Sequence, residues 1–155
     1  MTETFDLSGT SPAAAGTAVL ATASGLAKFS AIRVDAVLVG ATGGTLDVYI
    51  QRKIAPNVWV DWAHFAQLAG GASAVAYSLT VQAGNLGTVV NNTPSATMAA
   101  IATRGNDATP SPGLTASTVD LNHPGDMIRA VCVAGASTSA GAALKIMATG
   151  LGPSR

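Results

Sequence analysis

Few residues in this chain are suited to acid–base, nucleophilic or metal chemistry. There are two histidines, His64 and His123, and a single cysteine. A zinc site needs three or four ligands at workable spacing. Asp61 and His64 are three residues apart on an expected strand, so their side chains point to opposite faces unless a bulge intervenes. We therefore expect no metal site, and we expect His123 to lie in a turn over residues 122–126.

Nucleophilic and phosphate-binding motifs are also missing. Cys132 stands between two valines in an expected strand, the setting of an inert buried thiol. The chain has no Gly-x-Ser-x-Gly motif. Residues 40–44 are glycine-rich but lack the Lys-Ser/Thr pair of a phosphate loop. Solvated carboxylates, rather than a catalytic pair, are expected at Asp47, Asp61, Asp120 and Asp126. We predict that the protein is not an enzyme and binds no cofactor.

The composition indicates a surface that is covered by partners. Of 155 residues, 48% are hydrophobic and only 10% are charged, and the formal net charge is +0. An average soluble domain has about 25% charged residues. A free monomer needs surface charge to stay dispersed. We infer that other protein subunits cover much of this surface.

Charge and hydropathy exclude several kinds of partner. The eight Lys and Arg residues are balanced by eight Asp and Glu residues, so the basic excess typical of nucleic-acid binding is missing. Mean hydropathy is +0.40, yet no run reaches the roughly 18–20 apolar residues of a membrane span. No signal peptide is expected, because no basic segment precedes an apolar stretch near the N-terminus. One cysteine excludes an internal disulfide.

Alternation of apolar and polar residues with a period of two is the main structural signal. In residues 31–39 and 45–53 every second side chain is apolar. The buried core is expected to include Val34, Leu38, Val48, Ile50, Ile128 and Leu144. Strands are expected at residues 3–8, 17–23, 31–39, 45–53, 58–65, 74–82, 97–103 (the weakest), 114–121, 127–134 and 142–149. Residues 55–57, Ala-Pro-Asn, are expected to form a tight turn.

No segment has a convincing helical period. Residues 12–27 are the best candidate, but Gly16 and Gly25 argue against a helix there. About eight to nine short strands in one domain, residues 1–155, predict an all-β fold. We expect an antiparallel two-sheet sandwich of jelly-roll type.

Two regions are candidate contact surfaces. Residues 83–113 are rich in Gly, Asn, Thr, Ser and Pro, and we expect one long ordered loop or arm that contacts a neighbouring subunit. Aromatic residues cluster on the 45–65 hairpin, where they form either a sugar platform or a subunit anchor. Trp59 and Trp62 fall on opposite faces, so at most one serves a flat platform. The expected interface residues are Trp59, Trp62, Tyr49, Val89, Val90, Met98 and Ile101.

Three segments resemble a known class of proteins. They are residues 44–52 (Gly-Thr-Leu-Asp-Val-Tyr-Ile-Gln-Arg), 57–65 (Asn-Val-Trp-Val-Asp-Trp-Ala-His-Phe) and 124–131 (Pro-Gly-Asp-Met-Ile-Arg-Ala-Val). This strand pattern is similar to that of small β-sandwich virion structural proteins of tailed bacteriophages. The resemblance covers roughly residues 30–82 and 114–150.

The resemblance implies a head decoration (cement) protein, or a minor capsid or neck protein. The expected partners are further copies of the chain, with a trimer favoured, and a major capsid or other virion protein. The expected location is the virion, at the capsid surface, after synthesis in the host cytoplasm. A neck or tail component and a carbohydrate-binding module are the alternatives, and a hydrolase has no supporting residue set.

Overall fold

The computed structural model describes residues 1–10, 12, 15–39, 45–65, 67–69, 75–82, 89–91, 99–101, 118–120, 122–135 and 143–152. Most of them form strands, and the helical part among them is one short 3-10 turn, η1 (Leu26–Lys28). The strands are β1 (Thr2–Asp6), β2 (Gly9–Thr10), β3 (Gly16–Ala23), β4 (Ala31–Val39), β5 (Thr45–Ala55), β6 (Val58–His64), β7 (Leu68–Ala69), β8 (Val75–Gln82), β9 (Val89–Asn91), β10 (Ala99–Ile101), β11 (Thr118–Asp120), β12 (Ile128–Ala134) and β13 (Ala143–Leu151). Within this part of the chain no helix has the length and apolarity to cross a membrane.

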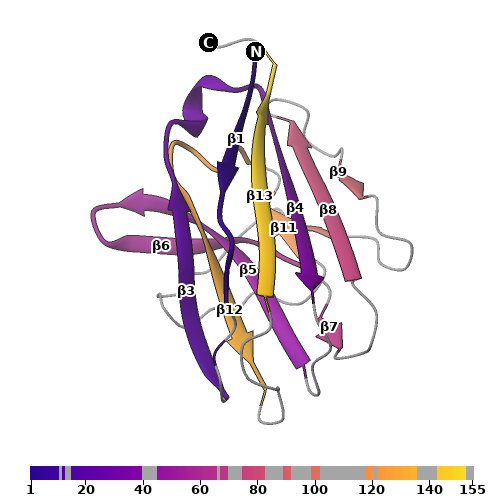
Figure 1. Cartoon of the computed structure of the whole chain (residues 1–155). Helices are drawn as coiled ribbons and strands as arrows, with labels where there is room; N and C mark the ends of the chain where they lie inside the picture. Colours follow the sequence, from indigo (N-terminus) through magenta and orange to yellow (C-terminus); the bar gives the residue numbers. More distant parts are fainter. Residues whose placement is uncertain are drawn as a thin grey trace.

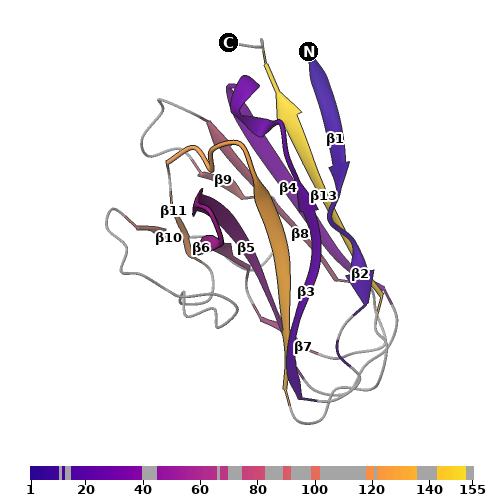
Figure 2. The same ribbon diagram turned by 90° about the vertical axis from the view of Figure 1, so that its left-hand side faces the viewer.

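Two sheets pack face to face (Figures 1 and 2). The first has the order β1-β13-β4-β8-β9, with β2 also paired to β13. The second has the order β10-β11-β6-β5-β12-β3, with β7 also paired to β5. All the long strands pair antiparallel, and the short β10–β11 pair is parallel. The predicted all-β, two-sheet sandwich is confirmed.

The pairing of the long strands is nested. β1 pairs with β13, β3 with β12, β4 with β8 and β5 with β6. Among strands of five or more residues, the first therefore pairs with the last, the second with the last but one, and so on inwards. This is the winding of a jelly roll, in which one long antiparallel ribbon is rolled into two sheets.

Most predicted strand limits agree with the structure to within one or two residues. The predicted strand at 31–39 is Ala31–Val39, and the one at 74–82 is Val75–Gln82. The predicted number was too low, because β2, β7 and β9 are pieces of two or three residues that single-strand periodicity does not reveal, whereas β10 and β11 fall within the predicted strands at 97–103 and 114–121. The sequence argued against a helix at residues 12–27, and this is confirmed over Gly16–Ala23, which form strand β3.

The core lies between the sheets and follows the period-two pattern. Val34, Val48, Ile50, Ile128 and Leu144 are buried as predicted, and the side chain of Leu38 lies outside the described residues. Larger side chains fill the interior around them, namely Trp62, Phe29, Phe65, Leu7, Leu26, Ile32, Leu46 and Leu79. One continuous cluster joins both sheets, as expected for a single domain.

The predicted arm at 83–113 falls mostly outside the described residues. Its two described pieces are β9, which pairs with β8, and β10, which pairs with β11. Both pairings are within the chain. The contact of this segment with a neighbouring subunit stays a prediction.

Candidate functional site

Strand β6 contains a bulge that changes which side chains share a face. Ile50 of β5 pairs with Ala63, but the next residue, Gln51, pairs with Asp61, so Trp62 is the extra residue. As a result Asp61 and His64 lie on the same face of the sheet, away from the core. Our prediction that they point to opposite faces is wrong, because the bulge interrupts the alternation between them.

The outer face of the second sheet carries two groups of polar contacts, which together we call the outer-face network. Nε2 of His64 lies 3.1 Å from Oδ1 of Asp47, and the imidazole stacks on the Tyr49 ring with 3.8 Å between centroids. Nε2 of Gln51 donates a hydrogen bond of 2.8 Å to Asp61. The side chains come from β5 and β6, whose register brings Tyr49 opposite His64 and Gln51 opposite Asp61.

The network continues onto β12 and ends at Trp59. Nε of Arg129 donates to Oε1 of Gln51 at 2.9 Å, and its guanidinium lies 4.5 Å from the centre of the Trp59 ring. Nζ of Lys53 lies 6.0 Å from the same ring. One face of the only partly exposed indole is therefore occupied by an arginine of its own chain.

Two carboxylates that we predicted to be solvated are in fact buried. Asp61 has no exposed surface and Asp120 is 3% exposed. Asp61 is held by Gln51, whereas Asp120 lies 3.0 Å from Nη2 of Arg52 and accepts two hydrogen bonds from Asn122. Buried charge is tolerated because each carboxylate has such partners. Asp126, in contrast, is exposed as predicted.

Two buried groups, the Tyr49 hydroxyl and the Cys132 thiol, have raised pKa values. Burial, followed by the nearby charges of Asp47 and Asp61, raises the pKa of Tyr49 to about 12. Burial, followed by Asp47, raises the pKa of the Cys132 thiol to about 12. Both groups are thus protonated at neutral pH, and a protonated thiol is a poor nucleophile. Among the described residues no three His, Cys, Asp or Glu side chains are grouped as metal ligands.

The predicted interface residues do not form one surface. Trp59 is partly exposed, and Tyr49 is 8% exposed beneath the network. Trp62 is inside the sandwich and donates from Nε1 to the Asn122 carbonyl at 2.8 Å, so a partner cannot reach it. The prediction of opposite faces for the two tryptophans is confirmed. Only the backbones of Val89, Val90 and Ile101 are described, in β9 and β10, and Met98 lies outside the described residues.

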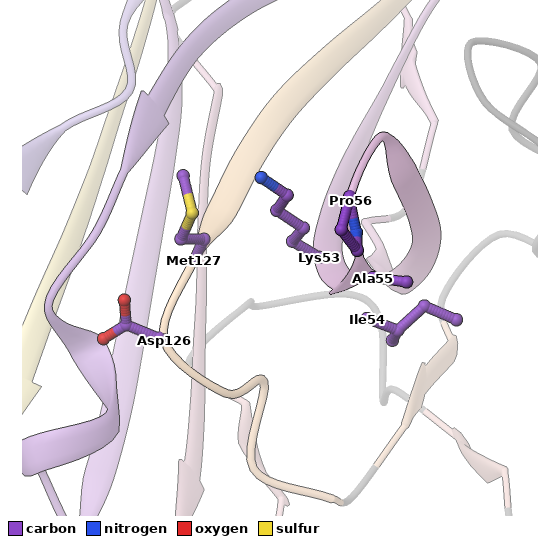
Figure 3. A pocket seen from close by; sticks show the side chains of 6 residues that line it. All are labelled: Lys53, Ile54, Ala55, Pro56, Asp126 and Met127. Atoms are coloured by element: carbon purple, nitrogen blue, oxygen red, sulfur yellow. The ribbon is translucent and has the colours of Figure 1, made fainter.

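A surface that we did not predict lies at the end of the β5–β6 ribbon. All five residues of the hairpin tip, Ile54–Val58, are exposed, and Ile54 and Val58 keep 52% and 44% of their surface. Beside the tip is a groove of about 300 Å³, lined by Lys53, Ile54, Ala55, Pro56, Asp126 and Met127 (Figure 3). The sequence signal that could have revealed this surface is the pair of β-branched apolar residues, Ile54 and Val58, on either side of the expected turn.

Comparison of the chain with family models, curated proteins and solved structures finds no match.

Proposed function

We propose that this protein is a non-catalytic structural subunit of a virion, specifically a capsid decoration protein. The observation that carries the proposal is the exposed apolar hairpin tip, Ile54–Val58, on a chain with only 10% charged residues. Exposed apolar groups at a rigid protrusion suit docking onto another protein. In this role the chain bridges adjacent capsid subunits and adds buried apolar area to the shell.

The fold and the resemblance support the same class of function. Jelly rolls with two Greek keys occur in viral capsid and lectin domains. Since one fold serves many functions, the architecture alone is not decisive. The strand pattern of residues 44–52, 57–65 and 124–131, which is similar to that of phage virion proteins, favours the capsid over the lectin.

The polar groups of the molecule give catalysis little support. In the outer-face network, Gln51, Asp61 and Arg129 bond to one another, and Tyr49 keeps its proton. Sugar binding is disfavoured by the arginine that lies over Trp59, because a sugar platform needs a free aromatic face. A neck or tail position remains the rival within the same class.

Co-sedimentation tests the proposal. The chain is to be mixed with empty shells assembled from the major capsid protein encoded in the same genome, and the shells are then pelleted. A decoration protein pellets with the shells at a fixed ratio and saturates. Recovery in the supernatant, combined with binding to purified neck or tail complexes, favours the rival. Binding to neither, with retention on a glycan array, supports a carbohydrate-binding module.

A further inference from the structure

The hairpin tip is shaped to present its apolar side chains outwards. Lys53 pairs with Trp59 and Ala55 with Val58, so Ile54 is a bulged residue without a partner in β6. Bulges re-aim side chains in this way. Among the strand residues whose side chains the structure describes, Ile54 is correspondingly the most exposed large apolar one, at 52%.

The turn at the end of the hairpin makes this presentation rigid. Pro56 and Asn57 connect the two strands, and Asn57 has a φ of 60°. Proline followed by a residue with positive φ is the signature of a type II turn. A preorganised tip loses little conformational entropy when a partner binds it.

The groove beside the tip combines apolar surface with two opposite charges, so its chemistry is complementary to that of the tip. In Figure 3, Asp126 and Met127 lie on one side, and Lys53 to Pro56 of the hairpin lie on the other. Met127 provides an apolar wall. Within the described part of the chain, neither Lys53 nor Asp126 has an oppositely charged group within 4.0 Å. As far as the described residues show, the groove thus holds one positive and one negative charge without an ion-pair partner, next to apolar surface.

We infer that the hairpin tip and the groove form the contact between copies of this chain. The tip of one copy packs into the groove of the next, with Ile54 and Val58 against Met127, and Lys53 pairs with Asp126 of the partner subunit. One surface carries both the apolar protrusion and the apolar hollow, and both charges, so it is complementary to itself. The neutral chain adds no long-range repulsion between copies. This inference rests on the proposed function, because it names the contact by which the subunit associates.

The proposed contact is small, and we therefore expect a low affinity between two copies of the chain. Stable interfaces bury about 800 Å² on each partner, and a five-residue tip with a shallow groove supplies only part of that. Association in solution should therefore be weak and concentration-dependent. On a shell that holds many copies side by side, the same contact gains from effective concentration.

Sedimentation velocity on the full chain, over the widest concentration range that solubility permits, is the test for wild type and variants. Val58→Ser and Ile54→Ser should each weaken self-association about tenfold. Val19→Ser is the matched control, since Val19 on β3 is exposed to the same 44% as Val58 but lies outside both the hairpin tip and the groove, and it should associate like wild type. Each variant is first shown to melt cooperatively near the wild-type temperature, so that loss of folding is separated from loss of contact.

Charge reversal isolates the pairing across the contact. Lys53→Glu and Asp126→Lys should each weaken association about tenfold, and the double variant, Lys53→Glu with Asp126→Lys, should regain affinity close to that of wild type. Association of Val58→Ser and Lys53→Glu equal to wild type would overturn the inference, as would a wild-type chain that stays monomeric throughout. Neither result bears on the proposed function, which stands or falls separately by binding of the chain to shells.

Discussion

Gly150 lies where the ring of Phe29 leaves no room for a side chain. A Cβ built at this position would overlap the ring atoms Cδ2, Cε2 and Cγ of Phe29. We predict that Gly150→Ala destabilises the fold by about 1–3 kcal/mol through overpacking, measured by urea denaturation. The additional loss should shrink in a Phe29→Ala background, because the three ring atoms that meet this Cβ are then absent. A Gly150→Ala protein as stable as wild type would show that Phe29 packs elsewhere.

Both tyrosines of the chain should resist ionisation. Burial raises the pKa of Tyr77, and burial together with Asp47 and Asp61 raises that of Tyr49 from 10.0 to about 12. The folded state thus holds its protons more tightly than the unfolded state. The stability that this contributes is fully present below pH 10 and is lost as the pH rises towards 12. We predict that tyrosinate absorbance of the native protein appears only above pH 10, and that Tyr49→Phe reduces the fall in stability over that range. Native tyrosinate at lower pH would contradict the burial of both rings.

At the scale of single residues, the sequence supported some predictions and misled others. The inert environment of Cys132 was foreseen because its two valine neighbours and the strand pattern suffice to place it inside. The buried positions of Asp61 and Asp120 were not foreseen. Gln51 meets Asp61 through the register of β5 against β6, and Arg52 of β5 reaches Asp120 on β11, two strands away in the sheet. Neither contact can be read from the alternation along a single strand.

At the scale of elements, the β5–β6 ribbon shows what periodicity can and cannot predict. Both strands and the turn at residues 55–57 were predicted from alternation and from the Pro-Asn pair. The two irregularities in its pairing were not, since a bulge is a property of two strands and not of one. Those irregularities decide the shared face of Asp61 and His64 and the exposure of Ile54.

The turn of this ribbon gives a prediction of its own. Asn57 adopts a φ of 60°, a region that asparagine and glycine tolerate and β-branched residues do not. Asn57→Gly should change the free energy of unfolding by less than about 0.5 kcal/mol, whereas Asn57→Val should cost about 1–2 kcal/mol. Chemical denaturation of the two variants checks this difference. Equal stability would mean that the turn has another conformation in solution.

At the scale of the whole molecule, strand number and alternation were enough to predict a two-sheet sandwich. The nested pairing of β1 with β13 and β3 with β12 joins opposite ends of the chain. No local pattern encodes such pairing, so the jelly roll was expected by analogy with other proteins of many short strands. The sequence also suggested covered surfaces from the low charge, without indicating that the β5–β6 hairpin tip exposes apolar side chains.

The measurement that tests the central claim most directly is calorimetry of purified capsid shells with and without the chain. If the protein is a decoration subunit, it binds the shells to saturation and raises the temperature at which they disrupt, because binding to the assembled state alone stabilises it. The increase should level off at the same protein ratio at which co-sedimentation saturates. Shells that disrupt at the same temperature with the chain present in excess, and that pellet without it, would contradict the account.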